Sequence, residues 1–250
     1  MKNNFIKINQ IRKKLKTNKP SFGTWMQIPH ADIAKILTNN NFDWIALDLE
    51  HGSGSINDIP KLSFVIGDSK SAFIVRISDE NFKSVGRFLD LGVEGFILSK
   101  VEDPKKIKEV IDKSNFPPEG DRGYGFSISN DFGLQDMSET LKFKPLIVAM
   151  IETVKGLKNI NRIVKVKGLD AIFIGPYDLS LSLGIPGQFQ NKKFQKTILN
   201  IINICKKNKI ACGIHMTEPK KDDLKENLKK GFTFIAYAMD SSFLKKIKLK

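Results

Sequence analysis

The chain has 250 residues, of which 41% are hydrophobic, and a formal net charge of +14. This length suits one α/β barrel or two small domains, and the apolar content is ample for a packed core. The sequence has no apolar run of about 18 residues, so we expect no membrane partner. Because the basic amino-terminal stretch lacks the apolar segment of a secretion signal, and Cys205 and Cys212 fit reduced thiols, we expect a cytoplasmic location.

The positive charge does not predict a nucleic-acid partner. Lysines are scattered over segments expected to form the outer faces of helices, and the sequence contains only five arginines. No basic stripe alternates with aromatic residues, as binding to single-stranded nucleic acid requires. We therefore interpret the charge as a solvated surface.

Apolar runs typical of buried strands alternate with helical patterns along nearly the whole chain. Strands are expected at 23–28, 44–52, 71–78, 95–101, 145–152, 169–178, 211–216 and 232–239. Helices are expected at 30–40, 56–70, 81–92, 103–114, 156–168, 193–208 and 219–231, and a long loop with a weaker helix at 116–143. This alternation predicts an α/β protein whose residues 1–250 form a single (β/α)8 TIM barrel, with a basic lead-in helix at 1–20 and a short carboxyl-terminal helix.

The segment 145–181 carries two carboxylates in one expected βαβ unit. Its two apolar runs each end on one acid, Glu152 and Asp178, and such units set two strands parallel and usually adjacent. Both acids would then lie at the carboxyl end of the barrel, where two protein oxygens suit Mg²⁺ or Mn²⁺. The alternative for each acid is a helix cap or a solvated loop residue.

Further polar residues follow the second and third expected strands. Asp48, Glu50 and His51 end the second, and an Asp close to a His can raise its basicity for proton transfer. The alternative for His51 is a solvated or capping residue. Arg76 interrupts an apolar run, so it should meet a carboxylate of a ligand, or pair with Asp48 or Glu50. Arg122 stands between glycines, as a possible ligand contact or part of an ordinary turn.

Several segments together resemble the class II pyruvate aldolases of the HpcH/HpaI family. The resemblance covers roughly residues 20–245, and the strings keep their order and spacing. Each string alone is a weak signal, but the combination is specific. The matching strings are GTWMQIPHADIAKILTNNNFDWIALDLEHG, VRIS, FPPEGDRGYG, MIETVKGLKNI and GLDAIFIGPYDLSLSLGIPG, with ACGIHMTEP further on.

The resemblance implies a barrel of the phosphoenolpyruvate/pyruvate-binding type and a metal-dependent aldolase. Such an enzyme cleaves or forms a 4-hydroxy-2-oxo acid from pyruvate and an aldehyde through an enolate that the metal stabilises. The resemblance assigns Mg²⁺, Mn²⁺ or Co²⁺ to Glu152 and Asp178, acid–base catalysis to His51 supported by Asp48, and the keto oxygen to Arg76. Backbone around Gly175, Tyr177 and Asp178 would receive the pyruvate carboxylate. Members are homo-oligomers, so a hexamer or trimer is expected.

The sequence departs from the family pattern at several positions. Met150 stands where well-studied members have Gln, Ser99 stands where many have Pro, and Tyr177 replaces a common Ala. Lys100, beside Ser99, is expected to point outward, the alternative being a new polar contact. Two other functions stay open: enolate chemistry on oxaloacetate, by decarboxylation or citrate-type condensation, and a non-catalytic binding barrel. The identity of the aldehyde is not predicted.

Overall fold

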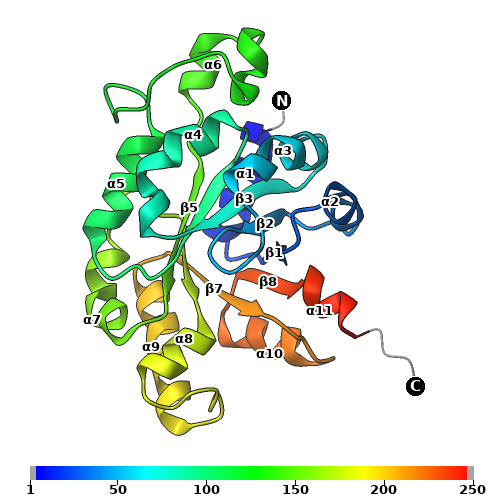
Figure 1. Ribbon diagram of the computed structural model, residues 1–250. Coiled ribbons are helices and arrows are strands. Elements are labelled where there is room, and N and C mark those ends of the chain that lie inside the picture. Colours follow the sequence, from blue (N-terminus) through cyan, green and yellow to red (C-terminus); the bar gives the residue numbers. More distant parts are fainter. Residues whose placement is uncertain (1–3, 247–250) are drawn as a thin grey trace.

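The computed structural model describes residues 4–246, in which eight parallel strands close into a barrel in chain order (Figure 1). This confirms the predicted (β/α)8 architecture. Residues 1–3 and 247–250 of the predicted 1–250 domain lie outside the described part. The strands are β1 (Ser21–Met26), β2 (Trp44–Asp48), β3 (Ala72–Ile77), β4 (Gly95–Leu98), β5 (Leu146–Ile151), β6 (Ala171–Ile174), β7 (Ala211–Met216) and β8 (Phe234–Met239).

Helices pack around the outside of the barrel and include the short helix expected at the carboxyl end (Figure 1). The α-helices are α1 (Asn4–Lys16), α2 (Ala31–Thr38), α3 (Ile59–Gly67), α4 (Val85–Asp90), α5 (Pro104–Ser114), α6 (Met137–Leu141), α7 (Val154–Ile163), α8 (Pro176–Ser182), α9 (Lys192–Lys207), α10 (Asp223–Lys230) and α11 (Asp240–Leu244). The 3-10 helices are η1 (Ile56–Asp58), η2 (Asp79–Ser84) and η3 (Ile128–Gly133). In the described part of the chain, no helix is long and apolar enough to span a bilayer.

Several predicted boundaries differ from the structure, and one of these differences changes the site. The strand expected at 169–178 ends at Ile174, and Pro176 begins α8, so Asp178 lies in the first turn of a helix. Proline suits a first turn because it lacks the N–H that such a position leaves unpaired. The predicted pairing of β5 with β6 is confirmed, with Ile151 opposite Ile174.

Alternate residues of each strand point into the barrel, because successive side chains of a strand face opposite sides. The barrel interior is a dense cluster that includes Trp44, Ile74, Val148 and Phe173, and the residues between them face the helices. Trp44 stacks on Phe234, with ring centroids 4.4 Å apart. The barrel is therefore a filled core, and ligands have access only at its ends.

The lead-in helix α1 covers the amino-terminal end of the barrel. Ile8 and Ile11 join the interior cluster, and Lys7 is buried with its ammonium 3.6 Å from the carboxylate of Glu94. Lys7 is thus an exception to the expectation that lysines lie on outer, solvated faces. Glu94 is fully buried, and one of its oxygens, Oε1, has no hydrogen-bond partner in the described part of the chain.

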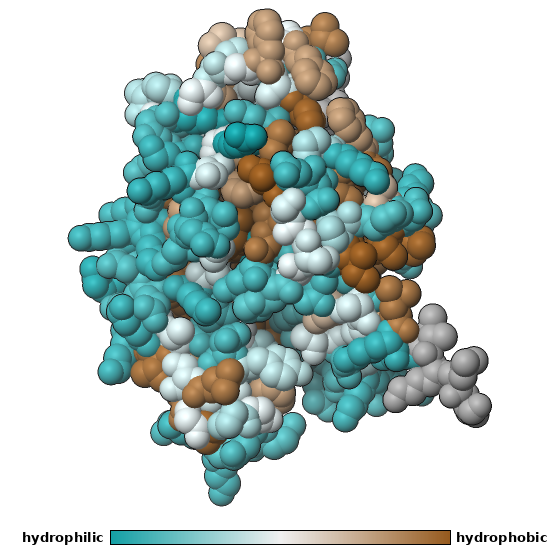
Figure 2. Space-filling model, viewed as in Figure 1, coloured by the Kyte–Doolittle hydropathy of each residue, from teal (hydrophilic) through white to brown (hydrophobic). Residues whose placement is uncertain are grey.

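The segment predicted as a long loop with a weaker helix contains η3 and α6. Four of its large apolar side chains are at least half exposed, and apolar residues gather over this region at the top of Figure 2. They are Phe126, Phe132, Leu134 and Met137. A contiguous exposed apolar surface of this kind is typical of an interaction site.

Glu94 makes stability depend on pH. Burial, opposed in part by Lys7, raises its pKa from 4.5 to about 7. The folded state therefore holds this proton more tightly than the unfolded chain. The resulting stabilisation is complete below about pH 4.5 and is lost as the pH rises to about 7, a change of about 3 kcal/mol. We expect Glu94→Gln to remove this component in urea unfolding, while Glu109→Gln, at an exposed position, keeps it. Equal pH dependence in wild type and Glu94→Gln would contradict the assignment.

Candidate active site

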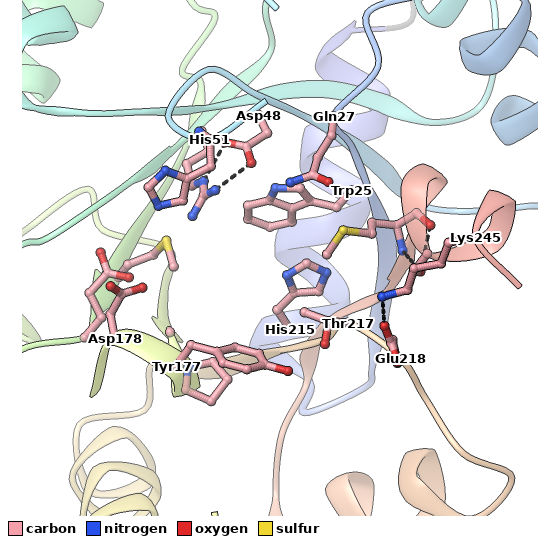
Figure 3. A pocket seen from close by; sticks show the side chains of 17 residues that line it. Trp25, Gln27, Asp48, His51, Tyr177, Asp178, His215, Thr217, Glu218 and Lys245 are labelled. Atoms are coloured by element: carbon pink, nitrogen blue, oxygen red, sulfur yellow. Dashed lines mark hydrogen bonds and ion pairs between the residues drawn. The ribbon is translucent and has the colours of Figure 1, made fainter. Parts of the chain in front are cut away.

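A cavity of about 370 Å³ opens at the carboxyl end of the barrel (Figure 3). Because the inward-facing alternation of each strand continues to its end, the last inward residues converge here. Most of the predicted site residues line this cavity. They are Asp48, His51, Arg76, Met150, Glu152, Gly175, Tyr177 and Asp178.

Arg76 is buried between two carboxylates. Its Nε donates to Asp48 Oδ1 over 2.8 Å and its Nη2 to Asp48 Oδ2 over 2.6 Å, while Nη1 lies 3.2 Å from Glu50 Oε2. Both partners are those expected for a structural ion pair. The Trp25 ring supports the guanidinium from a centroid distance of 5.2 Å. Burial alone would raise the pKa of Asp48, but the bonds and charge of Arg76 and two backbone N–H groups lower it overall.

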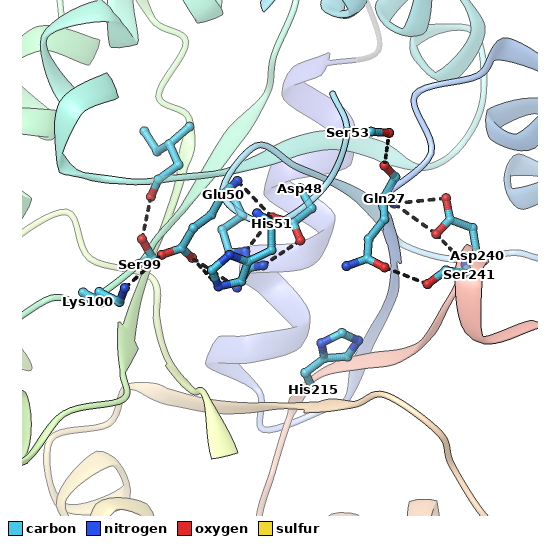
Figure 4. Close-up of polar contacts among 12 residues, drawn as sticks. Gln27, Asp48, Glu50, His51, Ser53, Ser99, Lys100, His215, Asp240 and Ser241 are labelled. Atoms are coloured by element: carbon cyan, nitrogen blue, oxygen red, sulfur yellow. Dashed lines mark hydrogen bonds and ion pairs between the residues drawn. The ribbon is translucent and has the colours of Figure 1, made fainter. Parts of the chain in front are cut away.

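Asp48 holds the loop that carries His51. Its Oδ1 accepts the backbone N–H groups of Glu50 and His51, each over 3.1 Å (Figure 4). The sequence predicts that Asp48 lies close to the His51 ring. In the structure, both oxygens of that carboxylate accept hydrogen bonds from Arg76 instead. The carboxylate near the ring belongs to Glu50, 4.0 Å from Nε2. The His51 side chain is 55% exposed, so its ring can exchange protons with solvent.

Glu152 is a buried acid at the end of β5. Its Oε1 accepts the backbone N–H of Lys100 over 2.5 Å. Burial, together with the negative charges of Glu50 and Asp178, raises its pKa from 4.5 to about 7. Its charged form is therefore costly unless a positive charge lies close by.

Lys100 adopts a left-handed backbone conformation, with φ of 47°, that directs its N–H at Glu152. The sequence predicts that its side chain points outward, away from the site. Its ammonium instead lies 3.7 Å from Glu50 Oε1. Ser99, its neighbour, is buried and donates to the Ile77 carbonyl, away from the cavity wall.

Gly175 joins β6 to α8 where Glu152 and Asp178 meet. A Cβ atom at this position would lie 2.4 Å from Glu152 Oε2, so only glycine leaves space for that carboxylate. Asp178, in the first turn of α8, adds a second carboxylate to the same cavity (Figure 3), and its charge acts on Glu152.

These residues fit a divalent cation. The carboxylates of Glu152 and Asp178 repel each other there, which adds to the effect of burial on the pKa of Glu152. A cation would offset both effects. Among residues 4–246, no cluster of three or more His, Cys, Asp and Glu side chains is arranged to hold a metal. The protein would thus supply two oxygens and leave the other positions to water or a ligand, which suits Mg²⁺ or Mn²⁺.

The sequence reasoning missed several residues of the cavity wall. Trp25, Gln27 and His215 are the inward residues at the ends of β1 and β7, and Thr217 and Glu218 follow β7. The two-residue alternation of each strand, continued to its end, is the signal that would have found the first three.

The position of Gln27 depends on α11. The Asp240 carboxylate accepts the backbone N–H groups of Gln27 and Ile28, over 3.0 and 2.9 Å. The Ser241 hydroxyl donates to Gln27 Oε1 over 2.7 Å (Figure 4). The short last helix therefore fixes one side of the cavity.

Arg122 lies apart from this cavity. Its Nη2 donates to Asp90 Oδ1 over 2.7 Å, and its guanidinium lies over the Phe116 ring at 4.6 Å. In the described chain it anchors the loop to α4 and does not contact the site.

Cation binding should compete with a proton on Glu152. Because its pKa is about 7 and binding needs the carboxylate, the apparent Kd for Mn²⁺ should rise about tenfold per pH unit below about pH 7. Calorimetric titration at about pH 6 and pH 8 measures this. Glu152→Gln should abolish binding and Glu109→Gln should leave it unchanged. Binding that is the same at both pH values would rule out Glu152 as a ligand.

Comparisons with known proteins agree on one family. Residues 21–246 match the family model described as HpcH/HpaI aldolase/citrate lyase. A hydroxypyruvate/pyruvate aldolase of Roseobacter denitrificans is 32% identical over 240 residues, covering 95% of this chain and 93% of that protein. A 5-keto-4-deoxy-D-glucarate aldolase of Citrobacter koseri is 32% identical over 243 residues, covering 96% and 93%.

A solved structure gives the same result. The HpcH/HpaI aldolase from Desulfitobacterium hafniense superposes with a TM-score of 0.86 at 28% identity, covering 94% of this chain and 92% of that one. The family match spans the barrel and every residue of the cavity described above. This chain is a member of the HpcH/HpaI aldolase/citrate lyase family.

Proposed function

We propose that this protein is a divalent-metal-dependent aldolase that cleaves or forms a 4-hydroxy-2-oxo acid from pyruvate and an aldehyde. Membership of an aldolase family supports a carbon–carbon lyase, and two relatives with aldolase names are 32% identical to it. The observation that carries the proposal is the buried Glu152, which lies beside Gly175 and lines one cavity with Asp178 and Arg76, whose charges both act on it.

The carboxylates of Glu152 and Asp178 would hold the cation. When bound, such a cation supplies a Lewis acid that stabilises negative charge on a 2-oxo acid. Arg76 adds a fixed positive charge for the keto oxygen. Asp48 and Glu50 engage three of its five N–H groups, which leaves two to donate toward a ligand. Because Asp48 and Glu50 already orient the guanidinium, it would not have to reorient when negative charge develops on the keto oxygen.

The start of α8 suits the carboxylate of the oxo acid. Tyr177 and Asp178 lie in its first turn, where backbone N–H groups have no partner within the helix. Gly175 precedes them and lets the ligand approach the backbone closely. These groups would fix the end of the substrate that does not react.

His51 would move the proton between the aldehyde oxygen and solvent. Its ring lies at the cavity wall, is half exposed, and has Glu50 as its nearest carboxylate. Asp48 would act as a positioning residue, because its oxygens hold Arg76 and the backbone of the His51 loop. A solvent-exposed histidine at the cavity wall suits general acid–base catalysis.

Exchange of the pyruvate methyl protons with D₂O tests the function without knowledge of the aldehyde. We expect Mn²⁺-dependent exchange in NMR, reduced about 100-fold or more in Arg76→Ala because a fixed charge at the developing oxyanion is lost. Arg87→Ala, an exposed arginine on α4, is the matched control and should exchange like the wild type.

The outcome separates the competing functions. Absence of exchange in the wild type with bound Mn²⁺ would overturn pyruvate as the donor. If oxaloacetate were then decarboxylated, the site would belong to the other enolate chemistry considered above. Inactivity toward both acids would support a non-catalytic binding barrel.

We also infer a homo-oligomer of three or six copies. The exposed apolar side chains of segment 126–137 support this, because a lone soluble chain rarely leaves such a surface open. Leu134 is 85% exposed, so Leu134→Glu should lower the mass measured by light scattering without unfolding the barrel. Leu199→Glu, at a half-exposed leucine on α9, is the control. A wild-type mass of one chain would contradict the inference.

A further inference from the structure

A second hollow of about 250 Å³ adjoins the active-site cavity. It lies between β7, α10 and the segment that joins α8 to α9. The two spaces share five wall residues, so they lie side by side. These residues are Pro176, Tyr177, His215, Thr217 and Glu218. The cation ligands lie only on the first side, which leaves the second hollow without a role in the proposed chemistry of the oxo acid.

His215 stands at the junction of the two spaces, stacked on Trp25 with ring centroids 4.7 Å apart. Its Nε2 lies 3.2 Å from the carbonyl oxygen of Ala238. A carbonyl only accepts, so Nε2 carries the hydrogen and, in the neutral ring, Nδ1 is an acceptor. Burial lowers the pKa of His215 to about 4, which keeps the ring neutral.

The acceptor on Nδ1 is available to a ligand. Within residues 4–246, Nδ1 of His215 makes no hydrogen bond, and the ring lies at the cavity, between His51 and Glu218 in Figure 3. A hydroxyl group is the neutral donor that such a nitrogen suits. A phosphate or carboxylate, which only accepts, would find no donor there.

The charges of the second hollow are unusual for this chain. In a protein of net charge +14, three carboxylates line it against one lysine, Lys230. The acids are Glu218, Asp223 and Glu226. Glu218 pairs with Lys245, and Asp223 accepts the backbone N–H of Lys220, so Glu226 is the carboxylate without a partner in the described chain. No arginine is among the wall residues, although arginine is the usual fork for phosphate or carboxylate.

We propose that the aldehyde half of the substrate passes His215 into this hollow, and that the hollow selects a hydroxylated aldehyde without an anionic group. This inference rests on the proposed aldolase function. The oxo acid would occupy the side of Glu152, Asp178 and Arg76. The hydroxyl next to the aldehyde carbon would donate to His215 Nδ1, and further hydroxyls would meet the oxygens of the hollow. An anionic end would meet Glu226 instead, and like charges suppress a wrong ligand.

Three aldehydes of equal carbon number test the selection. D-glyceraldehyde carries two hydroxyls, propanal carries none, and D-glyceraldehyde 3-phosphate carries an anionic end. With pyruvate and Mn²⁺ saturating, we expect kcat/KM for glyceraldehyde to exceed that for each of the others by about tenfold or more. A preference for the phosphate would overturn the proposal.

Two variants tie the selection to named residues. Glu226→Lys should raise kcat/KM for glyceraldehyde 3-phosphate relative to glyceraldehyde by about fivefold, and added salt should weaken this gain. Glu109→Lys makes the same charge change on α5, outside both spaces, and should leave the ratio unaltered. His215→Phe keeps the stacking on Trp25 but removes Nδ1, so it should lower kcat/KM for glyceraldehyde relative to propanal.

Pyruvate proton exchange separates the two levels of failure. If the wild type exchanges the methyl protons but both variants keep the wild-type ratios, the hollow does not select the aldehyde and this inference is wrong. If exchange is absent, the proposed function fails and this inference fails with it. Because each measure is a ratio within one protein, a partly unfolded preparation does not imitate the expected result.

Discussion

The excess of negative charge at the carboxyl end of the barrel is the constraint on which the site depends. Asp48, Glu50, Glu152 and Asp178 converge there on a single buried guanidinium, that of Arg76. Arg76 satisfies the first two acids, so the other two remain uncompensated. Burial is the main cause of the raised pKa of Glu152, and the charges of Glu50 and Asp178 add to it; a bound cation would offset both.

Each end of the barrel holds a buried acid, and the two acids have different consequences. Glu94, at the amino end, and Glu152, at the carboxyl end, both have a pKa raised to about 7 by burial. Helix α1 covers Glu94, which lies beside Lys7, so no ligand reaches it. The free-energy cost of burying this carboxylate therefore affects only the stability of the fold. Glu152 lines a cavity and feels the charges of two further carboxylates, so a cation in that cavity would offset the cost of its charged form. The surroundings of each acid decide its role.

The sequence predicted most of the fold because strands and helices alternate in period and composition. It also predicted the group at the barrel mouth, since residues that end adjacent parallel strands must converge there. It failed in two places for different reasons. Asp178 lies on a helix because Pro176 begins α8, a local signal that the preceding apolar run obscured. Lys7 is buried because α1 caps the barrel, a tertiary contact that no local pattern reveals.

The missed cavity residues show a second limit. His215 occurs in an apolar strand, and its place at the mouth follows only from knowing which face of β7 points inward. The contact of Lys100 with Glu50 depends on a left-handed residue that sequence reasoning did not anticipate. Arg122, flanked by glycines, resembled a ligand contact, but its partner is Asp90 on α4. Motifs predict residues near a site; backbone geometry decides which of them reach it.

Met150 links the departures from the family pattern to the chemistry. It is the inward residue two positions before Glu152, it is buried, and its methyl group lies against Gly175. By the family resemblance, Met150 stands where a glutamine is usual, and its thioether, only a weak acceptor, cannot donate to Glu152. Such a neighbour strengthens the desolvation that raises the pKa of Glu152. It also leaves the ligand and water to complete the shell of any cation, because the protein supplies only two carboxylates there. In the proposed enzyme, the affinity for a cation would therefore depend more on pH and on the oxo acid than on this part of the protein.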